Sequence, residues 1–148
     1  MNNKPVIVYA DDDPDDREMF REYLLMQSSE YELVEVANGR EVLLYLRSTK
    51  GLKNPPVLTV LDLNMPVLTG RETLAIMKSE KDTENLPVVV FTTSTSAHDD
   101  EFCRKFGIRM ITKPATVPEI EDTVKELLTF ITNESLLAKN LNSSHSIG

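Results

Sequence analysis

Residues 57–70 read VLTVLDLNMPVLTG, and this stretch decides the fold. It starts with five apolar or β-branched residues (57–61), a nearly continuous run that suits a strand covered on both faces. The run stops at Asp62, and the residues after it include asparagine, proline and glycine, which form turns. The stretch therefore predicts a buried strand that carries an acidic side chain at its carboxyl end.

Four further short runs of β-branched and apolar residues flank this strand, and segments with helical patterns separate them. The runs are Val6–Ala10, Tyr31–Ala37, Val88–Phe91 and Ile108–Thr112. The clearest helical pattern follows the last run, where apolar residues recur at steps of three and four. Its members are Val117, Ile120, Val124, Leu127, Leu128 and Ile131. Strands that alternate with helices predict right-handed crossovers and a parallel sheet with helices on both faces.

The composition is that of one ordinary globular domain. We expect this domain to span residues 1–132, followed by a polar tail, 133–148, that is rich in Ser and Asn and frays. A net charge of -8, from 16 basic and 24 acidic residues, argues against binding to DNA or to an anionic membrane. Cys103 is the only cysteine, so a disulfide within the chain and a cysteine metal site are excluded. With no apolar run long enough for a membrane span or signal peptide, a cytoplasmic setting is the default expectation.

We expect the functional site at the carboxyl ends of the strands. Ligands of an open parallel sheet bind outside the carboxyl ends of its strands. Four strand ends bring polar groups to this edge. Two of them carry carboxylates, in the acidic run from Asp11 and in Asp62, and the other two carry the hydroxyl of Thr92 and the amine of Lys113.

The acidic run DDDPDD at residues 11–16 has two interpretations. Asp13, Asp15 and Asp16 fit helix capping, because carboxylates are favourable at the positive end of a helix. Capping does not account for Asp11 and Asp12, which lie at the junction between strand and loop. Adjacent carboxylates repel one another, and oxygen ligands of this kind favour a hard divalent ion, of which Mg²⁺ is the first choice.

Asp62 could simply cap the turn that follows it. Beside a metal-binding pair of acids, however, it is a candidate carboxylate nucleophile for a phosphoryl group. Lys113 would add positive charge as a compact ammonium, and the Thr92 hydroxyl could donate to a phosphoryl oxygen. The alternatives without a functional role are that Lys113 is an ordinary surface lysine and that Thr92 only favours strand formation.

These pieces together resemble the receiver domains of two-component response regulators over roughly residues 5–131. The matching segments are VIVYADDDP, VLTVLDLNMPVLTG, PVVVFTTSTS and MITKP, and the second contains the pattern Asp-x-x-x-Pro-x-x-x-Gly. The resemblance implies a flavodoxin-like (βα)5 fold, with a doubly wound parallel sheet of strand order 2-1-3-4-5. It also implies phosphorelay signalling, with no output domain in this chain.

The resemblance assigns a role to each site residue. Asp62 accepts the phosphoryl group from a sensor histidine kinase or a histidine phosphotransfer domain. The implied metal ligands are Asp11, Asp12, Asp62 and the backbone carbonyl of Asn64, with Mg²⁺ as cofactor. Lys113 pairs with the phosphoryl group and precedes a cis bond to Pro114, Thr92 moves toward the phosphate, and Asn64 and Ser94 tune the lifetime of the acyl phosphate. Chemistry is limited to self-catalysed phosphorylation and autodephosphorylation.

The chain departs from the family at the residue three before the lysine. Met110 stands where the family usually has Tyr or Phe, so the aromatic switch is replaced, and Met110 is expected to repack instead. The segments LDLNMP and TTSTS resemble the corresponding segments of stand-alone receivers that serve phytochrome-type kinases. The output is expected to be a protein contact: onward phosphotransfer, regulation of the kinase, or formation of a homodimer.

Two rival functions remain open from the residues alone. A small phosphatase could also use an Asp nucleophile, Mg²⁺ and Lys, but it needs a second acid where this chain has Asn64. A binding module that works without phosphorylation is favoured mildly by Met110 and opposed by the full set of acids. His98 and His145 are expected to face solvent, and Cys103 is expected to be buried on the fourth helix.

Overall fold

The computed structural model describes residues 4–146, with side chains as far as Leu137, and the chain divides into two compact units between Lys113 and Pro114. The elements of the first unit are β1 (Val6–Ala10), α1 (Pro14–Gln27), β2 (Glu32–Val36), α2 (Gly39–Arg47), α3 (Thr49–Lys53), β3 (Leu58–Leu61), α4 (Gly70–Ser79), β4 (Val88–Thr92), α5 (Ala97–Lys105) and β5 (Arg109–Thr112). The second unit contains α6 (Val117–Ser146). Within residues 4–146, no helix combines the length and the apolar character needed to span a bilayer.

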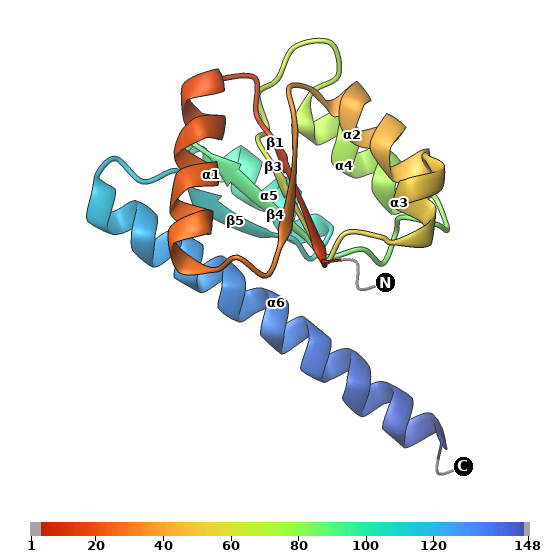
Figure 1. Cartoon of the computed structure of the whole chain (residues 1–148). Helices are drawn as coiled ribbons and strands as arrows, with labels where there is room; N and C mark the ends of the chain where they lie inside the picture. Colours follow the sequence, from red (N-terminus) through yellow and green to blue (C-terminus); the bar gives the residue numbers. More distant parts are fainter. Residues whose placement is uncertain (1–3, 147–148) are drawn as a thin grey trace. The chain divides into compact units, whose positions relative to one another are not determined.

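The first unit is built on a parallel five-stranded sheet in the order β2-β1-β3-β4-β5. This order and the flavodoxin-like crossovers confirm the fold predicted from the sequence. Helix α1 lies on one face of the sheet, and α2 and α4 lie on the opposite face (Figure 1). The order reverses beside β1, so the carboxyl ends of β1 and β3 meet at the switch point where such sheets bind ligands.

The three central strands, β1, β3 and β4, are buried because both of their faces are covered, whereas the edge strands β2 and β5 are partly exposed. On one face, side chains of α2, α4 and α5 pack against alternate strand residues; this core contains Ala10, Val42, Leu43, Leu46, Leu61, Leu74, Met77, Val88, Val90 and Cys103. On the other face, the Tyr9 ring stacks on Phe20 of α1 at 4.2 Å between centroids, and both rings meet Phe91 edge-on. Burying each large apolar side chain contributes about 1.5–3 kcal/mol, so this core holds the strand ends rigidly in place.

Helix α1 begins as the acidic run predicts. Asp13 is the N-cap residue, its carboxylate accepts a hydrogen bond from the Asp15 N–H at 2.9 Å, and Pro14 occupies the first turn. Asp15 and Asp16 follow in the first turn, where negative charge favours the helix. The capping interpretation is confirmed, although it is incomplete for Asp16, which also reaches the site described below.

Helix α6 differs from the expectation of a frayed tail. It is helical from Val117 through Ser146, and so continues past residue 132. From Glu119 to Ile147 the sequence contains neither proline nor glycine, so it lacks the residues that commonly end a helix. The division at residue 132 remains a prediction; the side chain of His145 and residues 147–148 lie outside the part of the chain that the structure describes.

Candidate functional site

Backbone pairing fixes the residues at the site. The hydrogen bonds of the sheet continue one residue beyond three of the strands, from Asp11 N–H to Val36 O at 3.1 Å, from Asp62 N–H to Ala10 O at 3.0 Å and from Lys113 N–H to Thr92 O at 2.7 Å. Thr92 itself is the last residue of β4. The predicted side chains therefore start from rigid, neighbouring positions along one edge of the sheet.

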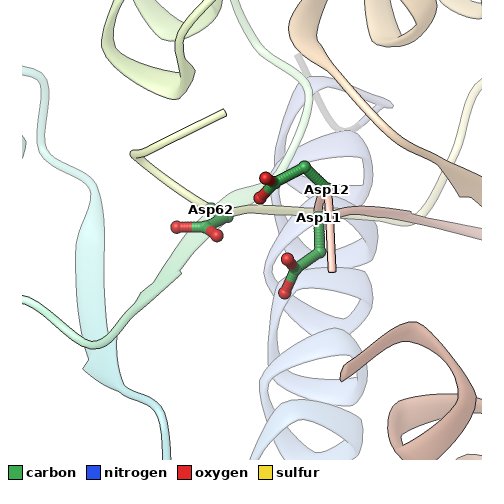
Figure 2. Close-up of side chains that lie close together, drawn as sticks. All are labelled: Asp11, Asp12 and Asp62. Carbon is green, nitrogen blue, oxygen red and sulfur yellow. The ribbon is translucent and has the colours of Figure 1, made fainter. Parts of the chain in front are cut away.

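The three predicted acidic ligands lie together. One carboxylate oxygen from each of Asp11, Asp12 and Asp62 lies within 4.8 Å of the others (Figure 2). Asp11 is 1% exposed and Asp62 7%, whereas Asp12 is exposed. A set of carboxylate oxygens that is open to solvent on one side fits a hard divalent cation such as Mg²⁺.

Lys113 balances part of this negative charge. Its Nζ donates hydrogen bonds to Asp11 Oδ2 at 2.6 Å, Asp16 Oδ2 at 3.0 Å and Asp62 Oδ2 at 3.1 Å. Burial works to lower the pKa of Lys113, but the bonds to Asp11 and Asp16 and the attraction of Asp11 and Asp62 outweigh it and leave the pKa above its ordinary value. The side chain is therefore an ammonium at any physiological pH.

Asp11 is the most firmly held of the acids. Its Oδ1 accepts the Asp13 N–H at 3.0 Å, and its Oδ2 accepts the Tyr9 hydroxyl at 3.1 Å in addition to Lys113. The Arg17 guanidinium also donates to the carbonyl oxygen of Asp11 at 2.7 Å. Burial, followed by the charge of Asp11, raises the pKa of Tyr9, so its hydroxyl stays a donor.

The Asp62 carboxylate is buried, which disfavours its charged form, and neighbouring donors offset part of this cost. Burial raises its pKa above the ordinary value, and the hydrogen bond from the Asn64 N–H to Oδ1, at 3.2 Å, and the charge of Lys113 oppose the rise only in part. The neighbouring charge of Asp11 raises the pKa further. A cation bound beside it would lower the free energy of its ionised form.

The loop after Asp62 is tightly constrained. A Cβ atom on Gly70 would lie 2.0 Å from the carbonyl oxygen of Asp62, so only glycine allows α4 to begin this close to the site. Within the loop, the Leu68 N–H donates to Pro66 O at 2.8 Å and Val67 has a φ of 69°, a three-residue turn that is strained for a β-branched residue. The close approach of Gly70 to Asp62 gives a physical reason for the glycine of the Asp-x-x-x-Pro-x-x-x-Gly pattern.

The loop after β4 is tied to neighbouring helices through Asp99, a buried residue of α5. Ser94 Oγ donates to Asp99 Oδ2 at 2.6 Å, and the Arg71 guanidinium from α4 donates to Asp99 Oδ1 through Nε at 2.9 Å and through a second nitrogen. The Ser94 N–H also donates to Thr92 Oγ1 at 3.1 Å. These bonds connect the predicted switch threonine to the packing of α4 and α5.

The remaining predicted residues lie close to this edge or within the core. Asn64 is exposed beside the carboxylates, and its Oδ1 accepts a long bond of 3.5 Å from Arg71. Met110 is paired with Val90 across the β4–β5 ladder and packs, partly buried, against the core. Its role as a switch stays a prediction.

Three minor expectations can be compared with the structure. The bond between Lys113 and Pro114 is trans, so the expected cis bond is wrong; the trans form is the one ordinarily favoured for a proline peptide, and the Lys113 ammonium bonds to Asp11 and Asp62 with this bond in the trans form. Cys103 is buried on α5, as expected, and burial raises the pKa of its thiol. His98 is exposed, also as expected.

Residues that the sequence analysis missed complete the site. Asp16 was interpreted as a capping residue, yet it lies four residues before the buried Phe20, on the helix face that points to the sheet, and this spacing could have revealed it. Tyr9, Arg71 and Asp99 carried no comparable signal, because their partners are distant in the sequence and known only from the fold.

Comparison with known proteins matches residues 7–125 to the response regulator receiver domain. Similar solved structures include the phosphorylated cyanobacterial phytochrome response regulator RcpA, with 31% identity, a TM-score of 0.79 and coverage of 88% of this chain and 95% of that one. The Mn(2+)-bound response regulator Rcp1 is 29% identical with a TM-score of 0.75, over 85% and 93% of the two chains. A response regulator in red light signalling of R. palustris is 26% identical with a TM-score of 0.74, over 85% and 92%. Among curated protein sequences, none matches.

Proposed function

The chain belongs to the family of response regulator receiver domains, and we propose that Asp62 is the residue on which it accepts a phosphoryl group. Receiver domains act in phosphorelay signalling as phosphoacceptor regulators and not as classical enzymes. The observation that carries the proposal is that the Asp62 carboxylate lies beside those of Asp11 and Asp12 and also accepts a hydrogen bond from the ammonium of Lys113.

The donor is a phosphohistidine of a sensor histidine kinase or of a histidine phosphotransfer domain. An oxygen of the Asp62 carboxylate attacks phosphorus, the new P–O bond forms as the P–N bond breaks, and the imidazole leaves with its electron pair and takes up a proton. Lys113 keeps its charge beside the acceptor throughout, and the Thr92 hydroxyl can donate to a phosphoryl oxygen. Hydrolysis of the acyl phosphate regenerates the carboxylate.

Receiver domains bind a divalent metal at an aspartate cluster, and we propose Mg²⁺ for this one. Asp11, Asp12, Asp62 and the backbone carbonyl of Asn64 would hold it. When bound, Mg²⁺ supplies positive charge that offsets the charge of the incoming phosphoryl group. The oxygen-only donor set and the Mn(2+)-bound form of the similar Rcp1 support a divalent ion at this position.

The phosphorylated state is transmitted through the loop after β4. Phosphorylation adds about -1.5 to -2 charges, for which Thr92 provides a donor. To turn toward Asp62, Thr92 must give up the bond that it accepts from Ser94, and Met110 on the adjacent strand repacks as it does so. Asn64, whose N–H donates to the acceptor, and Ser94, in the loop after β4, set the lifetime of the acyl phosphate.

The similarity to a cyanobacterial phytochrome response regulator favours a phytochrome-type kinase as partner. The phosphoryl group of such a kinase comes from ATP, which places the exchange in the cytoplasm. Phosphorylation then changes a protein-binding face of the chain, without DNA or a membrane as ligand.

Mass spectrometry of the intact protein tests the acceptor. After treatment with acetyl phosphate and MgCl2, the wild type should gain one phosphoryl group that hydroxylamine removes, and Asp62→Asn should gain none. Asp13→Asn is the matched control, since it also replaces an acid by its amide and asparagine is an equally good helix cap. Labelling of Asp62→Asn at the wild-type level would assign the acceptor to another residue.

A further inference from the structure

Lys113 has a third carboxylate partner that the proposed phosphoryl transfer does not use. An ammonium has three N–H donors, and those of Lys113 are directed to Asp11, Asp16 and Asp62. Asp16 comes from the first turn of α1 and lies outside the set of three carboxylates that could share a metal ion. Within residues 4–137, the hydrogen bond that its carboxylate accepts comes from the Lys113 ammonium.

The three partners differ in how easily they could return to water. The Asp11 side chain is 1% exposed and that of Asp62 10%, whereas the Asp16 side chain is 30% exposed. Separating a buried carboxylate from its partner leaves its charge uncompensated at low dielectric, while a partly exposed one is resolvated. Asp16 is therefore the partner that the ammonium can release at the smallest cost in free energy.

A phosphoryl group on Asp62 needs such a release. All three donors of Lys113 are occupied. Phosphorylation converts the Asp62 carboxylate to an acyl phosphate and frees one donor, but the phosphoryl group carries about -1.5 to -2 charges on three oxygens. A second bond from the ammonium to this group therefore requires that Asp11 or Asp16 give up its own. Asp11 also accepts from Tyr9 and from the Asp13 N–H, which hold it in place.

We infer that Asp16 is a positioning residue that competes with the phosphoryl group for Lys113: it holds the ammonium in the unphosphorylated protein and loses it when Asp62 is phosphorylated. The inference rests on the proposed function of Asp62 and Lys113. Its consequence is that Asp16 weakens the phosphorylated state, because the negative charge of Asp16 partly neutralises the cation that the phosphoryl group needs.

Asp15 provides a matched control. It lies in the same turn of α1 and carries the same charge, and its carboxylate is exposed. Among residues 4–137, the carboxylates that accept from Lys113 are those of Asp11, Asp16 and Asp62. Asp15→Asn therefore reproduces the change in long-range charge and in the helix dipole without changing the contact to Lys113.

The test is the affinity of the full chain for beryllofluoride at saturating Mg²⁺, measured by isothermal titration calorimetry. Asp16→Asn should bind roughly 5- to 10-fold more tightly than the wild type, as expected for the loss of one partly exposed competing charge. Asp15→Asn should stay within about twofold, and Asp16→Glu, which restores a carboxylate, should return the affinity toward that of the wild type. Asp16→Ser provides a second variant without the charge, with the same expected gain.

Mg²⁺ affinity without beryllofluoride separates this role from a general effect of charge. Asp16→Asn should weaken Mg²⁺ binding at least as much as Asp15→Asn, because each variant removes one negative charge near the cluster and Asp16→Asn also leaves Lys113 less neutralised. A gain in affinity that appears only for beryllofluoride is therefore specific to the competition for Lys113. Equal effects of the two variants on beryllofluoride binding, or weaker binding by Asp16→Asn, would overturn the inference and leave Asp62 as acceptor. A wild type that binds no beryllofluoride would overturn the proposed function as well.

Discussion

Asp12 differs from the other acids of the cluster in being exposed, and the hydrogen bonds of the Lys113 ammonium go to Asp11, Asp16 and Asp62. Its charge lies beside two carboxylates and therefore costs free energy when no cation is bound. Without Mg²⁺, Asp12→Asn should raise the free energy of unfolding by about 0.5–1 kcal/mol. With millimolar MgCl2 the order should reverse, because the wild type gains more from binding.

Urea denaturation in EDTA and in MgCl2 measures both parts of this prediction. Asp13→Asn is again the control, since it removes the charge of a side chain that caps α1 and keeps the backbone N–H that donates to Asp11. An Asp12→Asn protein that is clearly less stable than the wild type in EDTA would contradict the view that Asp12 is a repulsive ligand.

The sequence predicts that a residue belongs to the site when the backbone alone determines where its side chain begins. Asp11, Asp62, Thr92 and Lys113 follow directly from the ends of strands, and parallel strands end at the same edge. Asp16 was missed because a local role as capping residue explained it fully. Its bond to a lysine 97 residues away depends on how α1 packs on the sheet.

Between elements, Asp99 connects α5, the loop after β4 and α4. Its hydrogen bond from Ser94, and after that its bonds and charge interaction with Arg71, lower the pKa of Asp99 below the ordinary value. A lowered pKa means that the stability from Asp99 is present above the ordinary carboxyl pKa of about 4 and is lost as the pH falls through the lower value in the folded state. Asp99→Asn should therefore cost about 1–3 kcal/mol near neutral pH and little in acid.

Denaturant unfolding of the wild type and of Asp99→Asn between neutral and acidic pH measures how this difference in stability changes with pH. Asp100→Asn is the control: it is adjacent, and its ion pair with Arg104 is an exposed pair on one helix, expected to be worth less than about 0.5 kcal/mol. If the two variants lose equal stability at neutral pH, Asp99 does not connect the elements as described.

Elements were predictable where their pattern was long or strongly apolar. All five strands were located to within one residue at each end, because runs such as 88–92 are buried on both faces. Helix α3 was missed, since five residues are too few to display a helical period, although Ser48 caps it by accepting from the Gly51 N–H. The length of α6 was underestimated because the polar composition of its end was taken as a sign of fraying.

For the whole molecule, we predict that residues 133–148 are not needed for ligand binding. Every residue of the proposed site lies within the unit that ends at Lys113, and the family match ends at residue 125. A chain that ends at Thr132 should therefore keep its affinities for Mg²⁺ and beryllofluoride within about twofold of the full-length values, since all site residues precede Pro114 and surface changes away from such a site usually alter free energies by less than about 0.5 kcal/mol. Titration calorimetry measures both affinities, and circular dichroism follows the loss of helix. If the shortened chain aggregates or loses either ligand, residues 133–148 belong to the folding unit and the predicted boundary at 132 is wrong.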